Sequence, residues 1–229
     1  MLGGTSGMGL AIAQAARAHG AGRVVVAGRT PGQSEAAVAV LGPRVEVGTL
    51  DVTDDEALRD LMIRIGPIDH LVFTAGGFRS APMREQTLED ASYGMDIKFW
   101  GAWKAVRHAD IRPGGSVLLF SGSASRRPRA GGVIMAATNA AVEGLGRALA
   151  IELSPIRVNV LSPGFVPDTG VYAAMSAADR EAMTGQVAQV LPVRRAGAAA
   201  DIAQAALALM TNPYITGVVL DVDGGGTIA

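Results

Sequence analysis

The sequence contains no cysteine. This absence excludes disulfide bonds, thiolate metal sites and cysteine nucleophiles, and it is typical of a protein from a reducing compartment. Histidine is scarce as well, and His19, His70 and His108 lie far apart along the chain. We therefore expect no metal site.

Long apolar runs are also missing. No stretch is long enough to span a bilayer, and the chain does not open with the charged and then apolar segments of a secretory signal. The formal net charge of −1 gives no reason to expect nucleic acid or an anionic membrane as a partner. We therefore expect a soluble, cytoplasmic protein that acts on a small molecule.

Hydrophobic residues make up 49% of the 229 positions, which is enough for one α/β domain with a substantial core. Strand patterns and helical patterns alternate over residues 1–229 with short connections, which predicts a single doubly wound parallel sheet of the Rossmann type. The expected strands are 23–28, 45–50, 68–74, 116–121, 157–161 and 218–222. The expected helices are 10–19, 31–41, 53–65 with Thr53 as its N-cap, 88–109, 134–153 and 198–210.

Glycines punctuate the stretch directly ahead of the first helix, where Gly3, Gly7 and Gly9 form the spacing GxxxGxG. Glycine removes the side chain that would block a close ligand. The first turn of a helix offers unpaired N–H groups and a partial positive charge. The stretch therefore predicts a cradle for a pyrophosphate, and a glycine turn without a ligand is the alternative. The positions between these glycines that we assign to the same cradle are Thr5, Ser6 and Met8.

A loop of this kind normally follows a central strand, but only Met1 and Leu2 precede it here. The strand is therefore either a stub, or residues upstream of Met1 are missing from the sequence as given. We expect missing residues, because a parallel sheet without its central strand would leave a deep unpaired groove.

Several ordered motifs resemble those of the short-chain dehydrogenase/reductase family over nearly the whole chain. Besides the glycine stretch, they are Asp51-Val52, Ala75-Gly76, the strand-to-serine stretch 115–125, residues 156–164 and residues 216–225. The resemblance implies a Rossmann-type fold that binds NAD(P) and an oxidoreductase activity.

The resemblance also implies individual roles at the cofactor. Asp51 would hydrogen-bond the adenine, with Val52 beside it, although a strand-end cap is the alternative for this aspartate. The stretch Ala75-Gly76-Gly77 would let a ribose approach closely. Val166, after Pro163-Gly164, would offer its backbone to the nicotinamide carboxamide.

The end of the second expected strand bears on the choice of dinucleotide. An NAD enzyme usually places a carboxylate there to hold the ribose 2′-OH, whereas a nearby arginine accommodates a 2′-phosphate. In this chain Gly28 occupies the carboxylate position, and Arg29 and Thr30 follow. A guanidinium can bind phosphate through two hydrogen bonds. We therefore predict NADP(H) rather than NAD(H), with a solvent-facing arginine as the alternative.

The active-site pattern of the family is broken in this chain. Family members use a serine and a Tyr-x-x-x-Lys pair, but the tyrosine position falls on Met135, and a thioether cannot transfer protons. The serine position falls on or next to Gly122, which Ser121 and Ser123 flank. Either serine could hydrogen-bond a substrate carbonyl, although serine at a strand end is also ordinary turn chemistry.

The family pattern also has an asparagine on the preceding long helix, and in this chain the residue types at the asparagine and lysine positions are exchanged. Lys98 stands where the family has an asparagine, and Asn139 stands where it has the lysine. We hypothesise a swap in which the ammonium and the amide still meet near the nicotinamide ribose. The alternative is a surface Lys98 and a polar helix residue at Asn139.

Three further expectations concern the substrate side and the assembly. The stretch Arg126-Arg127-Pro128-Arg129 lies at the expected rim of the substrate pocket and either attracts an acidic substrate or is a solvated basic loop. Residues 165–195 form a variable, partly helical substrate-side segment in which Tyr172 is a candidate lid phenol. The resemblance implies a homodimer or homotetramer through the helices 88–109 and 134–153.

These observations leave two functions. The first is an NADP(H)-dependent oxidoreductase that acts on a carbonyl, an alcohol or an activated double bond, with an altered proton donor. The second is a non-catalytic NADP(H)-binding sensor or assembly protein. Fold alone cannot separate them.

Overall fold

The computed structural model describes residues 1–42, 45–172 and 175–229. Its strands pair only in parallel, in the orders β1-β2 and β3-β4-β5-β6. Leu2 makes parallel bridges to Ala27 in β1 and to Phe73 in β3, so a single residue joins the two groups. The strands are β1 Val24–Gly28, β2 Val45–Thr49, β3 Ile68–Phe73, β4 Ile111–Phe120, β5 Arg157–Pro163 and β6 Val219–Val222.

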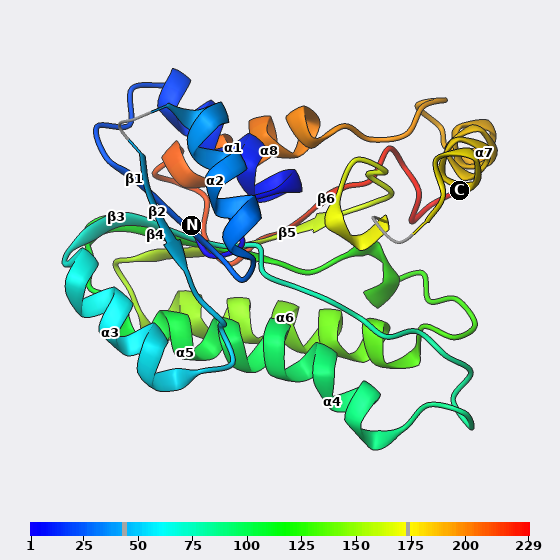
Figure 1. Ribbon diagram of the computed structural model, residues 1–229, viewed down its shortest axis with the longest axis horizontal. Coiled ribbons are helices and arrows are strands. Elements are labelled where there is room, and N and C mark those ends of the chain that lie inside the picture. The colour runs from blue at the N-terminus through cyan, green and yellow to red at the C-terminus, as the bar shows by residue number, and fades with distance from the viewer. Residues whose placement is uncertain (43–44, 173–174) are drawn as a thin grey trace.

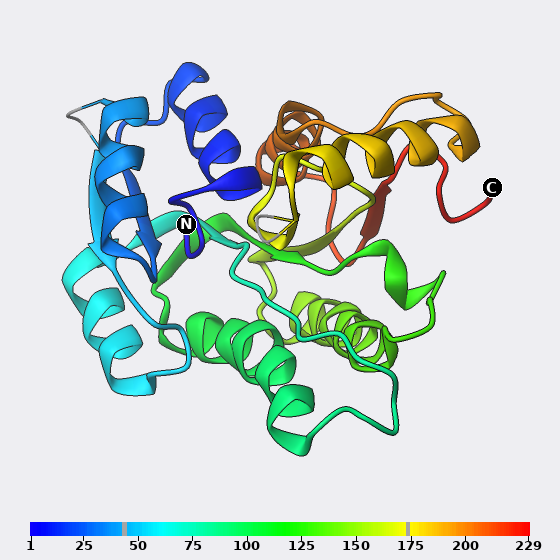
Figure 2. The ribbon, with the colours of Figure 1, turned by 45° about the vertical axis from the view of Figure 1, so that its right-hand side comes forward.

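Helices cover both faces of the sheet (Figures 1 and 2). On one face lie α1 Gly7–Ala18, α2 Pro31–Leu41 and α8 Ala199–Thr211. On the other lie α3 Asp55–Ile65, α4 Leu88–Met95, α5 Gly101–His108 and α6 Val133–Glu152. The helix α7 Ala177–Val190 lies beyond the end of the sheet, near the C-terminus. This arrangement confirms the predicted doubly wound parallel fold.

The sequence of the strands explains why both faces must be covered. Every residue of β5 is buried, and β1 is a run of valine, alanine and glycine with one half-buried position. Strands without a polar face are stable only between two helical layers. The apolar sides of α1 and α8 meet the sheet through Ile12 and Ile202, and α3 meets its opposite face through Leu58.

Three expected boundaries were wrong. Asp54, not Thr53, is the N-cap of α3, because its carboxylate accepts a hydrogen bond of 3.0 Å from the Ala57 N–H. Thr53 instead donates twice to Asp51, through its backbone N–H at 2.9 Å and its hydroxyl at 2.8 Å. The strand β4 begins at Ile111 rather than at 116, because a shift in register lets Ile111 pair with Ile68.

The third difference concerns the helix expected over 88–109. A π-helical turn, Asp96–Trp100, separates α4 from α5, and its wider turn leaves the adjacent residues Ile97 and Lys98 both buried. No described helix is both apolar enough and long enough for a membrane span.

Candidate functional site

The site lies at the edge of the sheet where the strands end. Because the strands are parallel, the segments that follow them meet at one edge. The glycine stretch, Arg29 after β1, Asp51 after β2 and Ala75 after β3 together line a cavity of about 260 Å³. The predicted cofactor residues in its lining are Gly3, Thr5, Ser6, Gly7, Met8, Gly9, Arg29, Thr30, Asp51, Val52, Ala75 and Gly76.

Four predicted cofactor residues do not line this cavity. A side chain at Gly77 would lie 3.0 Å from the ring of Tyr93, so that glycine makes room for an aromatic residue of α4. Pro163 is buried in β5, and Gly164 lines a different cavity. Val166 is 2% exposed, and its carbonyl accepts a hydrogen bond of 2.9 Å from Thr169.

The glycine turn is packed too tightly for other residues. A Cβ added at Gly9 would lie 2.2 Å from the Gly3 carbonyl oxygen, and one added at Gly3 would lie 2.6 Å from the Ala75 nitrogen. The N-cap of α1, Ser6, makes no side-chain cap, and the first turn of the helix carries no acidic residue. The first amides of α1 are thus left for an outside acceptor, which is the arrangement that a phosphate group fits.

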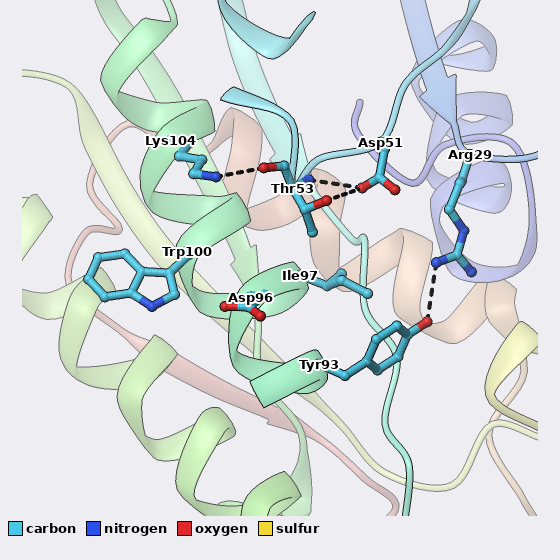
Figure 3. Close-up of a pocket in the computed structure, with 8 residues that line it drawn as sticks. All are labelled: Arg29, Asp51, Thr53, Tyr93, Asp96, Ile97, Trp100 and Lys104. Carbon is cyan, nitrogen blue, oxygen red and sulfur yellow. Dashed lines mark hydrogen bonds between the residues drawn. The ribbon is translucent and has the colours of Figure 1, made fainter. Parts of the chain in front are cut away.

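A second cavity, of about 530 Å³, adjoins the first and shares Arg29, Asp51 and Ile97 with it (Figure 3). Arg29 and Tyr93 point toward each other across its opening.

The hydrogen bond from the Thr53 backbone is the main cause that lowers the pKa of the Asp51 carboxyl below its usual value. Asp51 is therefore an ionised acceptor at neutral pH.

Lys98 is a buried charge beside the site: a Cβ added at Gly76 would lie 3.9 Å from its Cδ, although Lys98 does not itself line the 260 Å³ cavity. Its Nζ donates to the Asn139 Oδ1 at 2.5 Å and to the Ser121 carbonyl oxygen at 2.7 Å. Lys98 is 7% exposed, which contradicts the alternative of a surface lysine. Burial lowers the pKa of the Lys98 ammonium to about 7, and the nearby carboxylate of Glu143 opposes this shift.

Two hydroxyls without partners among the described residues belong to residues that touch or adjoin this pair: Ser121, whose carbonyl binds Lys98, and Thr138, which precedes Asn139. Within the described part of the chain, the buried hydroxyls of Ser121 and Thr138 make no hydrogen bond. Gly122 lies directly beside the amide of Asn139. Met135, one turn before Asn139 on α6, contributes only a thioether. Buried polar atoms that lack partners are unusual in a folded protein.

A network of charges lies behind the pair on α6. Glu143 accepts a hydrogen bond of 2.6 Å from the Ser125 hydroxyl, and its other oxygen lies 3.5 Å from the Arg126 guanidinium. Arg126 also pairs with Asp221 at 2.6 Å. Arg127 donates to the Gly226 carbonyl oxygen at 2.5 Å. Two arginines of the basic loop thus make hydrogen bonds within the chain, while residues 126–129 are all exposed, as in a solvated basic loop.

A third cavity, of about 330 Å³, has a largely apolar wall and a cationic rim. Tyr172 packs edge-on against Phe165, with 4.9 Å between ring centroids. Burial raises the pKa of Tyr172, while the charge of Arg129 acts in the opposite direction. Residues 173–174 of the predicted substrate-side segment lie outside the described residues. Its lining includes Ser123, Arg129, Met135 and Tyr172.

Several lining residues were not predicted. Gln33, Thr169 and Gly170 line the 260 Å³ cavity, and Tyr93 lines the 530 Å³ cavity. Nothing in their local sequence distinguishes them, because tertiary packing alone brings them to the site. Among the described residues, no group of three histidines or acidic residues is arranged to hold a metal ion.

The comparisons with known proteins agree with this geometry. A family profile described as Enoyl-(Acyl carrier protein) reductase matches residues 3–227. The "Short-chain dehydrogenase/reductase ucsE" of Acremonium sp is 32% identical, over 100% of this chain and 94% of that protein. A crystal structure of a small-chain dehydrogenase in complex with NADPH is 36% identical, with a TM-score of 0.83, over 100% of this chain and 97% of the other. The MalC Reductase/Diels-Alderase from Malbranchea aurantiaca is 29% identical, with a TM-score of 0.90, over 100% of this chain and 95% of the other.

The fold and the open cradle at α1 define a dinucleotide-binding class of protein. The family profile and the relative from Acremonium sp match almost the full length of the chain. The chain therefore belongs to the short-chain dehydrogenase/reductase family.

Proposed function

We propose that this protein is an NADP(H)-dependent oxidoreductase of the cytoplasm that acts on a carbonyl, an alcohol or an activated double bond. The observation that carries the proposal is the uncapped first turn of α1, which opens into the 260 Å³ cavity beside Arg29. The NADPH bound in the similar small-chain dehydrogenase supports the choice of cofactor.

The chain's own residues divide the cofactor between them in this proposal. The amides of the glycine stretch hold the pyrophosphate, and Ala75-Gly76 accept a ribose at close range. Asp51 and Val52 bind the adenine. Arg29, with Thr30, binds the 2′-phosphate, because a guanidinium matches phosphate geometry. When it is bound, the cofactor supplies a hydride.

The nicotinamide end is assigned to the other side of the sheet edge. There Pro163-Gly164 and Val166 are proposed to contact the nicotinamide half, and Lys98 and Asn139 are proposed as the exchanged polar pair beside its ribose. Gly77 is proposed to act with Ala75-Gly76 at the other ribose. Residues 165–195 of the single domain would shape the substrate side. The apolar wall of the 330 Å³ cavity supports a substrate with an apolar body, which Ser121 and Ser123 would approach from β4.

The proton chemistry is expected to be weak. Met135 stands where the family tyrosine is expected, and its thioether has no proton to give. General acid catalysis contributes about 10²–10⁴-fold to a rate, so we expect slow turnover or a substrate that needs little protonation.

A direct experiment measures NADPH absorbance in the presence of a panel of aromatic ketones, aldehydes and enones. Oxidation of NADPH with any member of the panel supports the oxidoreductase. Binding of NADPH without oxidation over the whole panel supports the alternative, a sensor or assembly protein. Failure to bind NADPH in a calorimetric titration would remove the basis of both.

We also propose a homodimer or homotetramer that forms through α5 and α6. Trp100 and Trp103 expose 46% and 36% of their surface on this side of the chain. The accessible surface is 11460 Å², more than the roughly 9,700 Å² expected of a compact monomer of this mass. Sedimentation equilibrium of the wild type and of Trp103→Lys tests this, and a monomeric wild type contradicts it.

A further inference from the structure

The contact between Lys98 and Asn139 fixes the orientation of the Asn139 amide. A lysine ammonium carries donors and no acceptor, so it must face the carbonyl oxygen of the amide. The 2.5 Å contact is accordingly to Oδ1. The NH₂ group of Asn139 is therefore turned away from Lys98.

That NH₂ group faces a gap. A Cβ at Gly122 would lie 3.0 Å from Nδ2, so the absence of a side chain at Gly122 leaves this space open. Asn139 is only 2% exposed, and no described residue accepts a hydrogen bond from its Nδ2. Nδ2 is not among the fully buried polar atoms without a partner, so the small exposure of the residue reaches this donor. A ligand oxygen at that point would give the donor its missing acceptor.

The surroundings indicate which ligand can reach the donor. Ser123 follows Gly122, and Met135 precedes Asn139 by one turn of α6, and both line the 330 Å³ cavity. The gap beside Nδ2 is thus next to the cavity assigned to the substrate rather than to the cradle at α1.

We propose that the Asn139 NH₂ group is the donor that binds the substrate's carbonyl oxygen, and that Lys98 is the positioning residue that aims it. This inference rests on the proposed function. When a hydride adds to the carbonyl carbon, or to the β carbon of an enone, the π electron pair moves onto the oxygen. The amide N–H stabilises the oxyanion that results and keeps its own proton, and water then protonates the product.

A donor that gives no proton selects among substrates. Hydride addition to a ketone makes an alkoxide, which is strongly basic and needs a proton at once. Hydride addition to an enone makes an enolate, whose charge is shared with carbon and which an N–H donor can stabilise alone. The site is therefore suited to activated double bonds more than to simple ketones.

The test uses benzoate, whose carboxylate mimics the oxyanion, with the full chain both free and saturated with NADP⁺. The binding of benzoate should shift the side-chain amide signals of Asn139 in ¹⁵N NMR. Asn139→Asp keeps the shape and the contact with Lys98 but presents an acceptor, so benzoate should bind roughly tenfold more weakly or worse, as expected for the loss of a charged hydrogen bond. Asn212→Asp makes the same charge change at an exposed position and is the matched control.

Unmoved Asn139 signals at saturating benzoate, or equal benzoate affinity of wild type and Asn139→Asp, overturns the inference. Thermal unfolding of Asn139→Asp shows whether the variant is folded, and the NMR result on the wild type decides the matter if it is not. NADPH titration is measured separately. Normal NADPH binding with unmoved Asn139 signals refutes this inference alone, whereas absent NADPH binding refutes the proposed function.

Discussion

The Arg29 guanidinium donates a hydrogen bond of 3.2 Å to the Tyr93 hydroxyl, which links the end of β1 to α4 across the cavity opening. Arg79 lies over the ring of Tyr93, with its Cζ 4.5 Å from the centroid. The tyrosine thus holds Arg29 at the position where we expect a 2′-phosphate.

Arg29→Ala should weaken NADPH binding far more than NADH binding. The loss of a charge-assisted hydrogen bond costs about 1.5–3 kcal/mol, which corresponds to roughly 10- to 100-fold in the NADPH Kd. Tyr93→Phe should act in the same direction but less, because it removes only the hydroxyl that holds Arg29. Calorimetric titration with both nucleotides measures this.

Arg59→Ala is the control, because Arg59 is an exposed arginine of α3 that pairs with Glu56 and Asp60. It should leave both affinities unchanged. Equal weakening of NADPH and NADH by Arg29→Ala would refute the assignment of the 2′-phosphate.

Gly9→Ala should destabilise the protein and abolish the cradle. The added Cβ would lie 2.2 Å from the Gly3 carbonyl oxygen, and a backbone atom cannot move aside without distorting the turn. Overpacking of this kind costs about 1–3 kcal/mol. Gly185→Ala in α7 is the matched helical control, since no atom lies within 4 Å of its added Cβ, and it should be neutral or stabilising by about 0.5–1 kcal/mol. Urea unfolding compares the two variants, and a Gly9→Ala variant as stable as Gly185→Ala contradicts the packing argument.

Because of Lys98, the free energy of unfolding should change with pH above about 7. Its pKa in the folded chain is about 7, below the ordinary value of 10.5, so the unfolded chain binds more protons between these values. The stability of the wild type relative to Lys98→Met should therefore rise with pH above about 7, by up to ~1.4 kcal/mol per pH unit, and level off above the ordinary lysine pKa. Urea unfolding of both proteins from pH 6 to 10 measures the difference.

Lys104→Met removes the same charge outside the buried site and controls for net charge. A stability difference between wild type and Lys98→Met that stays constant over the whole pH range would show that the folded chain does not depress the pKa of Lys98.

Arg129 should favour acidic substrates. Arg126 and Arg127 are already held by other groups of the chain, which leaves Arg129 as the rim cation beside Tyr172. Arg129→Gln should raise the KM, or the competitive Kd, of 4-acetylbenzoate several-fold and leave its methyl ester unchanged. Arg112→Gln is the control. Arg112 lies at the start of β4, at the opposite end of the strand from Arg129, and pairs with Asp69 of β3. An equal effect on the acid and the ester would assign Arg129 a structural role only.

The sequence was informative wherever a local pattern determines the structure. Alternating apolar segments predicted the parallel sheet, and parallel strands require that Arg29, Asp51 and Ala75 meet at one edge, which they do. The exchanged types at Lys98 and Asn139 predicted that these two side chains meet, and they are in contact. Their catalytic roles stay predictions.

What could not be predicted depends on packing between distant segments. Thr53 is as good an N-cap by type as Asp54, and only the carboxylate of Asp51 decides between them by binding Thr53. Tyr93 reaches the 530 Å³ cavity only because Gly77 leaves room for its ring. No periodicity in the sequence distinguishes a π-helical turn from the α-helix on either side of it.

In that π-helical turn, the Gly101 N–H bonds to the Asp96 carbonyl oxygen five residues earlier, so the turn holds one residue more than an α-helix does. Deleting a single residue from Asp96–Trp100 would let this turn close to regular α-helix, and the flanks α4 and α5 would keep nearly their present orientation because the wide turn only takes up the extra residue. The deletion would change the turn itself, where the adjacent residues Ile97 and Lys98 are both buried. The contact between Lys98 and Asn139 thus depends on one extra residue in a single turn of backbone, in a segment that an ordinary helix of the same composition would not provide.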